Sequence, residues 1–185
     1  MKEIALYILD IDQNSIAANA SALEVELAEK AETIVFRIAD NGVGMTPELL
    51  AQVSDPFTTT RTTRKMGLGL PLLRMAAEQT GGCLTIESVE GTGTTVTARF
   101  QASHIDCPPV GDMAGTVALL LQGAPDLELH YTHTIEKARF QLGTEELRAQ
   151  LGPGISLAEP DVILWIRDYL EEQESLLREH KGMNV

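Results

Sequence analysis

The chain has 185 residues, of which 44% are hydrophobic and 22% charged, with a formal net charge of −13 at pH 7. These proportions are typical of a folded globular protein, and the length allows one medium domain or two small ones. The strong negative charge excludes a broad surface for nucleic acid or anionic membrane, since both need positive charge. No apolar run is long enough to span a membrane, and no signal-peptide core is present. We therefore expect a cytoplasmic protein.

The hydrophobic pattern of the first hundred residues predicts helices and strands packed as an α+β sandwich, with helices on one face of a mixed sheet. In chain order we expect a helix over 2–20, strands over 23–27 and 33–39, a short helix from Pro47 ending before Asp55, a helix over 68–79, and a hairpin of strands over 83–88 and 94–100. In the first helix, Asp10 and Asn14 are four positions apart and so lie side by side.

Two glycine pairs bracket a loop rich in threonine and basic residues. The first pair, Gly42 and Gly44, follows Asp40 at the end of a predicted strand. A carboxylate there can accept a hydrogen bond from an exocyclic amine such as N6 of adenine. Glycines let the backbone approach a flat ring where a Cβ would collide. This stretch predicts one wall of a nucleotide pocket.

The second pair, Gly67 and Gly69, opens a predicted helix, so free N–H groups and the helix dipole would face a phosphate chain. The loop before it, residues 55–65, would form a lid over the phosphates. Its basic side chains, Arg61, Arg64 and Lys65, would supply a local basic patch for the phosphates in a chain that is acidic overall.

Two further segments, Leu9–Ser15 and Glu90–Thr95, complete a set of four motifs in a fixed order. This set resembles the ATP-binding domain shared by gyrase, Hsp90, sensor histidine kinases and MutL, known as the Bergerat or GHKL fold. The runs Pro56–Thr60 and Gly67–Leu70 are most similar to the histidine-kinase branch. The resemblance covers about residues 1–102 and implies a Bergerat-type α/β sandwich.

The resemblance implies roles for individual residues. Asn14 would coordinate the Mg²⁺ that bridges the phosphates, and Asp40 with Gly42 and Gly44 would hold adenine. Asp10 occupies the position of a catalytic glutamate in the hydrolysing branches. Because aspartate is one methylene shorter, nucleotide binding is expected whether or not ATP is hydrolysed.

Further nucleotide contacts follow from the same resemblance. Thr94 would assist adenine binding through a water, and Met45 either packs near the ring or belongs to the core. Phosphate-binding N–H groups would come from Gly67, Leu68 and Gly69, with Arg64 or Lys65 adding charge. Thr59 and its neighbours either cap the lid or lie on its surface.

Residues 103–111, with Pro108-Pro109, read as a linker between an ATP-binding domain over 1–102 and a small C-terminal α/β domain over 112–185 whose fold we do not assign. The expected elements of that domain are a helix over 113–122, strands over 127–133 and 137–142, a short helix capped by Thr144, and an amphipathic helix over about 160–180. His130 and His133 would point to opposite faces of their strand.

These features predict an Mg-ATP-binding, histidine-kinase-like domain that acts on or with a separate protein in signalling or regulation, as a protein kinase or a slow ATPase. The alternative is an ATP-dependent binding switch with little or no phosphotransfer. The partner would be response-regulator-like, an anti-sigma-type target or a redox protein. The whole chain also resembles small ATPase-like proteins encoded beside iron-only hydrogenases. Because the chain begins at the helix bearing Asn14, we expect no phosphoacceptor-histidine hairpin.

Overall fold

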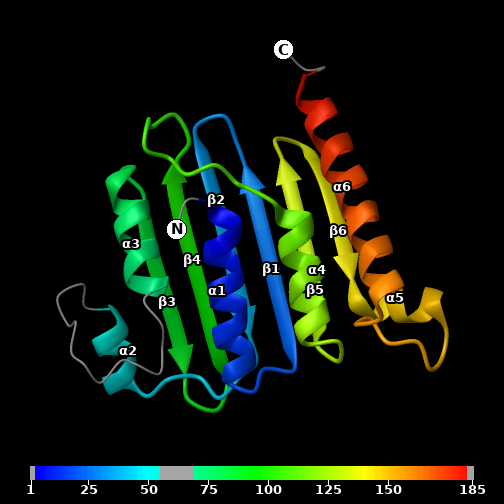
Figure 1. Cartoon of the computed structure of the whole chain (residues 1–185). Coiled ribbons are helices and arrows are strands. Elements are labelled where there is room, and N and C mark those ends of the chain that lie inside the picture. The colour runs from blue at the N-terminus through cyan, green and yellow to red at the C-terminus, as the bar shows by residue number, and fades with distance from the viewer. Residues whose placement is uncertain (1–2, 55–68, 183–185) are drawn as a thin grey trace.

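The computed structural model describes residues 3–54 and 69–182, and each helix and strand expected from the sequence has a counterpart among them (Figure 1). The elements are α1 (Ile4–Ala17), β1 (Ala22–Glu29), β2 (Thr33–Asp40), α2 (Pro47–Ser54), α3 (Gly69–Gln79), β3 (Cys83–Val89), β4 (Gly93–Gln101), α4 (Met113–Gly123), β5 (Glu128–Ile135), β6 (Ala138–Gly143), α5 (Thr144–Leu151) and α6 (Pro160–Gly182).

The strands form one six-stranded sheet in the order β3-β4-β2-β1-β5-β6. Neighbouring strands are antiparallel except for β1 and β5, which run parallel, so the sheet is mixed as predicted. In the pairing of β2 with β4, Asp40 lies opposite Thr94. This register brings the last residue of β2 to the start of β4, at the edge where the glycine motifs gather.

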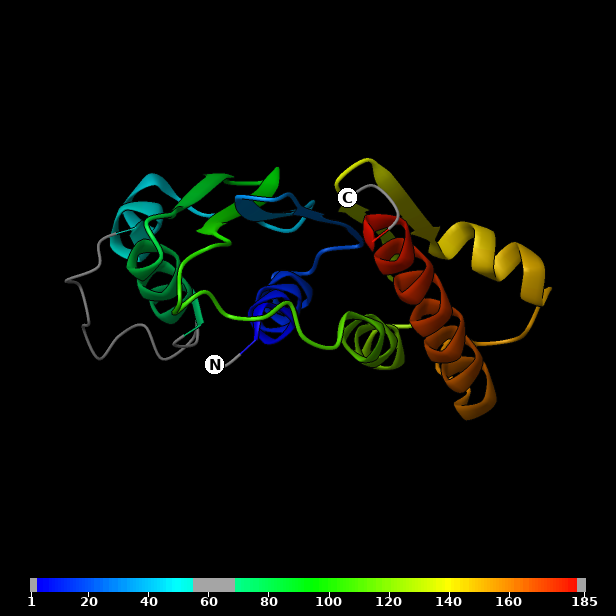
Figure 2. The same ribbon diagram turned by 90° about the horizontal axis from the view of Figure 1, so that it is seen from above.

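One face of the sheet is apolar and the other is polar, because side chains alternate along each strand. In β1, Leu23, Val25 and Leu27 are each 1% exposed, whereas Glu24 between them faces solvent. Helices α1, α3, α4 and α6 lie on the apolar side, and no described helix covers the other side (Figure 2). The fold is an α+β sandwich with helices on one face.

The C-terminal part of the chain extends the same sheet. Strand β5 pairs with β1 along its whole length, from Ala22 opposite Glu128 to Glu29 opposite Ile135. The segment expected to be a linker, residues 103–111, contains no helix or strand and packs on α1, where the backbone N–H of Ile4 donates to the carbonyl of Pro109 at 2.9 Å. The two parts share one sheet and one hydrophobic core. The division into two domains joined by a linker stays a prediction.

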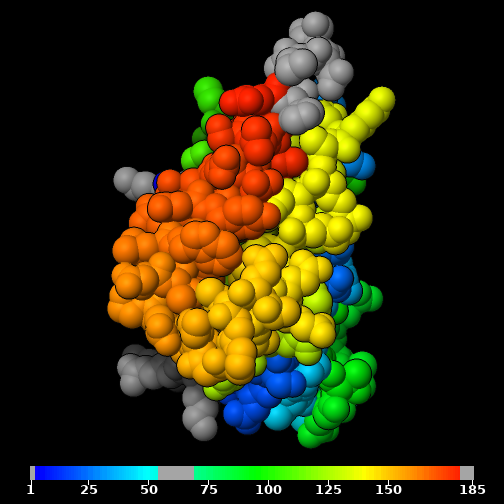
Figure 3. All heavy atoms as spheres, turned by 90° about the vertical axis from the view of Figure 1, so that its right-hand side faces the viewer, coloured from blue at the N-terminus to red at the C-terminus, as the bar shows by residue number. Residues whose placement is uncertain are grey.

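Helix α6 runs along the β6 side of the molecule (Figure 3). Its buried stripe is formed by Val162, Ile166 and Leu170, at 8%, 0% and 0% exposed. One expectation nearby is wrong. Thr144 does not cap α5, because the N-cap position is Gly143. The hydroxyl of Thr144 instead accepts from the Leu129 N–H at 2.9 Å.

Candidate functional site

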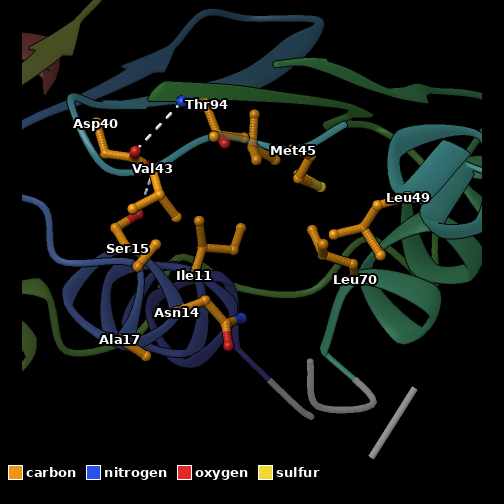
Figure 4. Close-up of a pocket in the computed structure, with 13 residues that line it drawn as sticks. Ile11, Asn14, Ser15, Ala17, Asp40, Val43, Met45, Leu49, Leu70 and Thr94 are labelled. Atoms are coloured by element: carbon orange, nitrogen blue, oxygen red, sulfur yellow. Dashed lines mark hydrogen bonds between the residues drawn. The ribbon is translucent and has the colours of Figure 1, made fainter. Parts of the chain in front are cut away.

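A pocket of about 230 Å³ opens where α1, the loop after β2, α2, the start of α3 and β4 meet (Figure 4). The residues that line it come from segments far apart in the sequence, and most of them are apolar. They are Ile11, Asn14, Ser15, Ala17, Ala18, Asp40, Val43, Gly44, Met45, Leu49, Leu70, Thr94 and Val96. An apolar slot with a few polar groups at one end suits a flat heterocyclic ring.

Among the described residues, Asp40 is the charged group of this lining, and three hydrogen bonds hold its carboxylate. Its Oδ1 accepts from the backbone N–H of Gly42 at 2.9 Å and from that of Thr94 at 3.2 Å. Its Oδ2 accepts from the hydroxyl of Ser15 at 2.7 Å. In Figure 4, Asp40 and Ser15 lie at one end of the pocket, and Leu49 and Leu70 lie at the other.

Ser15 was missed in the sequence interpretation, although the pattern of α1 contains a signal for it. Ile4, Ile8 and Ile11 form the buried stripe of the helix, and Ser15 continues that stripe at 3% exposed. A hydroxyl on a buried stripe needs a hydrogen-bond partner. The partner, Asp40, is 25 positions away.

A second hydroxyl, that of Ser88 in β3, organises the opposite wall. Its Oγ accepts from the backbone N–H of Met45 at 2.9 Å and lies 2.8 Å from Oγ1 of Thr94, its cross-strand neighbour. Both predicted residues, Met45 and Thr94, therefore line the pocket and are tied to each other through Ser88. Met45 is also 9% exposed, so it belongs to the buried core as well as to the pocket wall.

The first glycine pair has a structural role in addition to the ligand contact expected of it, which stays a prediction. Gly44 has φ +65°, and a Cβ there would overlap the carbonyl oxygen of Val89. A Cβ on Gly42 would lie 2.7 Å from the carbonyl oxygen of Ala18. Both glycines allow protein backbone to approach protein backbone, which closes the loop around Asp40. Gly44 lines the pocket, whereas Gly42 contributes through its N–H to Asp40.

Asp10 lies beside the first residue of α3. A Cβ added to Gly69 would overlap the Asp10 carboxylate, so the two residues are in close contact. The Oδ2 atom of Asp10 is buried and has no hydrogen-bond partner among the residues that the structure describes. The predicted base and the predicted phosphate-binding helix start are therefore brought together, with an acceptor atom left unsatisfied between them.

Asn14 lines the pocket one helical turn after Asp10, as their spacing predicted. In the part of the chain that the structure describes, no three His, Cys, Asp or Glu side chains are arranged to hold a metal ion. A single amide oxygen is nevertheless a suitable donor for Mg²⁺, which keeps most of its ligands as water and phosphate oxygens. Asn14 therefore fits a metal–phosphate group in this pocket, whereas Asp10 is not part of the pocket lining and lies behind Asn14, against Gly69.

Asp12, between these two residues, belongs to neither role. It is 1% exposed, its Oδ1 has no hydrogen-bond partner within 3–54 and 69–182, and it is not part of the pocket lining. Burial raises the pKa of Asp12 well above its ordinary value.

Several predicted residues lie outside the described residues: Thr59, Arg64, Lys65, Gly67 and Leu68. Their roles stay predictions.

Among the residues that the structure describes, no helix has the length and hydrophobicity needed to cross a membrane.

The fold and this pocket define an ATPase-type nucleotide-binding sandwich. Comparison with known families matches residues 3–104 to the histidine kinase-, DNA gyrase B- and HSP90-like ATPase family. The match spans more than half of the chain, and the chain belongs to this family. The mixed sheet with its covering helices is the Bergerat-type sandwich of that family, as predicted, and the protein contains an ATP-binding, histidine-kinase-like domain.

Individual relatives are a sensor kinase, a histidine protein kinase and a sporulation kinase. The chain is 26% identical over 175 residues to the sensor kinase CckA of Brucella abortus. This alignment covers 82% of this chain and 18% of CckA. It is 42% identical over 67 residues to the histidine protein kinase DivJ of Caulobacter vibrioides, covering 34% of this chain and 11% of DivJ. It is 30% identical over 98 residues to sporulation kinase B of Bacillus subtilis, covering 51% and 23%. The chain therefore spans less than a quarter of the length of each of these relatives.

Proposed function

We propose that the chain binds Mg-ATP in the pocket between α1 and β4, with the adenine amine donating to Asp40. The observation that supports this most directly is the state of the Asp40 carboxylate, which three protein donors hold at one end of an apolar slot. Such a carboxylate can accept a further N–H, whereas a base with a carbonyl at that position would bring a second acceptor against it.

Asn14 would place its side-chain oxygen on Mg²⁺, and Gly69 would present the start of α3 to the phosphates. Bound Mg²⁺ would neutralise charge on the phosphate oxygens. Asp10 would accept the proton of the attacking hydroxyl, water or imidazole, a role that its buried, unsatisfied oxygen supports. The acceptor of the phosphoryl group would be a separate protein, as the kinase relatives suggest.

The binding proposal is tested by calorimetric titration of Mg-ATP into the wild type and into Asp40→Asn. We expect affinity to fall by about tenfold or more, because an amide offers a donor where adenine requires an acceptor. Asp126→Asn makes the same chemical change on an exposed residue and should bind as wild type does. Equal affinity in Asp40→Asn would remove the adenine assignment.

The chemistry is tested by following the labelled γ-phosphate of ATP in a lysate of the host. Label on a protein band, lost in Asp10→Ala, would support a kinase and identify its substrate. Label released as inorganic phosphate would support a slow ATPase. Asn14→Ala should bind ATP with no dependence on Mg²⁺.

A specific observation also favours the second candidate, an ATP-dependent binding switch. Asn41, the residue after Asp40, accepts from the backbone N–H groups of Ser21 and Ala22, each at 2.9 Å. The carbonyl of Ser21 in turn accepts from the N–H of Glu128 at the start of β5. Movement of the Asp40 loop on nucleotide binding would thus be transmitted through these hydrogen bonds to the start of β5. In that case Asp10→Ala should abolish chemistry and leave nucleotide-dependent partner binding intact.

A further inference from the structure

We propose that Ser15 orients Asp40 and thereby sets the preference of the pocket for a purine that carries an amine at position 6. This inference rests on the proposed function, and it assigns to Ser15 a positioning role that acts through Asp40.

Within the part of the chain that the structure describes, the hydrogen bonds of Asp40 leave one acceptor position for a ligand. An ionised carboxylate has about four acceptor positions. Two on Oδ1 are taken by the N–H groups of Gly42 and Thr94, and one on Oδ2 is taken by the hydroxyl of Ser15. Because Oδ1 is fully used by backbone donors, the remaining acceptor position belongs to Oδ2, the oxygen that Ser15 contacts.

Ser15 is held more rigidly than an average surface serine. It is 3% exposed and follows Ile8 and Ile11, at 0% and 5% exposed, on the stripe that packs α1 against the sheet. Its backbone carbonyl also accepts from the N–H of Ala20 at 3.1 Å. A hydroxyl fixed on a packed helix gives the carboxylate plane one preferred rotation, which a backbone donor to Oδ1 alone does not.

The chemical consequence is selectivity between bases. With Ser15 present, one lone pair of Oδ2 faces the pocket and matches one N–H of an exocyclic amine. Without the hydroxyl, Oδ2 has two free acceptor positions, and the carboxylate is held through Oδ1 alone, so that its plane is less well fixed. The contact to the amine is then weaker, whereas the apolar contacts to the ring remain.

The test uses the full chain and two nucleotides, ATP and purine riboside 5′-triphosphate, which has hydrogen in place of the amine. Each is titrated by calorimetry with Mg²⁺ into the wild type, Ser15→Ala and Ser21→Ala. Ser21 also has a hydroxyl engaged in a hydrogen bond, but its partner is the side chain of Asn41. It is therefore a matched serine-to-alanine control that leaves the bonds of Asp40 in place.

We expect Ser15→Ala to bind ATP about tenfold more weakly and to bind the purine riboside nucleotide as the wild type does, so that the ratio of the two affinities falls. Ser21→Ala should keep the wild-type ratio. Unaltered binding of the purine riboside nucleotide also reports that Ser15→Ala is folded.

An unchanged ratio of the two affinities in Ser15→Ala would overturn the inference. If both affinities fell by the same factor, the role of Ser15 would be purely structural. Failure of the proposed function looks different. In that case the wild type itself would bind neither nucleotide, or would not prefer the one with the amine.

Discussion

The imidazole Nδ1 of His133 in β5 lies 2.7 Å from Oε1 of Glu174 in α6. His133 is 0% exposed, and its Nε2 lies 3.1 Å from Oε1 of Glu29 in β1. The same Glu174 oxygen accepts from the hydroxyl of Tyr131 at 2.8 Å, and Arg178 contacts Glu29 at 3.3 Å. This cluster joins the ATP-binding sheet to the last helix.

The cluster predicts that the stability of the protein falls as pH rises above neutrality. Burial lowers the pKa of His133, but its hydrogen bonds and attraction to Glu174 and Glu29 outweigh burial, so the pKa is raised. A group with a raised pKa stabilises the fold below its unfolded value, about 6.5, and loses that contribution as pH rises through the folded value. A neutral imidazole has one N–H and can donate to only one of the two carboxylates.

The measurement is chemical denaturation of the wild type and His133→Gln between about pH 6 and pH 9. We expect the variant to be less stable by about 1–3 kcal/mol at the acid end and the difference to shrink toward the alkaline end. His130→Gln, on the exposed face of the same strand, should follow the wild type. A constant difference across this range would contradict the charged state of His133.

Gly69→Ala tests the contact between α3 and the Asp10 carboxylate. The added Cβ would overlap that carboxylate, so Asp10 must rotate away. If Asp10 is the base, transfer or release of the γ-phosphate should fall by about a hundredfold, as in Asp10→Ala. In an Asp10→Ala background the glycine change should add nothing, because no carboxylate remains to be displaced. Additive losses would show that Gly69 acts independently of Asp10.

Gly44→Ala should destabilise the loop that closes the pocket. Gly44 and Gly91 both have positive φ, +65° and +76°, so alanine is strained at either position. Only at Gly44 would the Cβ also overlap backbone, the carbonyl oxygen of Val89; at Gly91 it meets nothing within 4 Å. We expect Gly91→Ala to cost about 1 kcal/mol and Gly44→Ala clearly more, with weaker ATP binding. Equal melting temperatures of the two variants would contradict this packing.

Asp12→Asn should stabilise the protein at neutral pH. Because burial raises the pKa of Asp12, the folded state favours the protonated acid. Its contribution to the free energy of unfolding therefore falls as pH rises above the unfolded pKa, about 4. An amide cannot ionise, so the variant should gain about 1 kcal/mol or more near pH 7 and lose this advantage near pH 4. If the denaturation curves of the wild type and the variant coincided at both pH values, burial of the Asp12 carboxyl would not destabilise the fold at neutral pH.

The sequence predicted the helices and strands well, because apolar residues recur with the short period of a strand or a helix. The strands of residues 23–27 and 33–39 are present and longer than expected, and the helix expected over 2–20 ends at Ala17. Thr46 accepts a hydrogen bond from the N–H of Leu49 at 3.3 Å, as a helix cap should. Thr144 was assigned the same role wrongly, because its hydroxyl has partners in the neighbouring strand.

The site was predicted in part. Asn14, Asp40, Gly44, Met45 and Thr94 line one pocket, although their binding roles remain proposals. Ser88 was missed because one of its partners, the N–H of Met45, lies 43 positions away in the loop after β2 and meets β3 only in the folded chain. The structural reason for Gly44 was also missed, since the Val89 carbonyl reaches it from another strand.

By itself, the sequence determined the motifs, their order and the class of fold, because periodicity and glycine spacing are local properties of the chain. The tertiary structure decided which distant groups meet: β5 against β1, Ser15 on Asp40, and His133 between Glu29 and Glu174, residues 104 and 41 positions away. Such contacts depend on how the faces of whole elements pack, and a polar residue on a buried stripe reveals that it needs a partner without revealing which one.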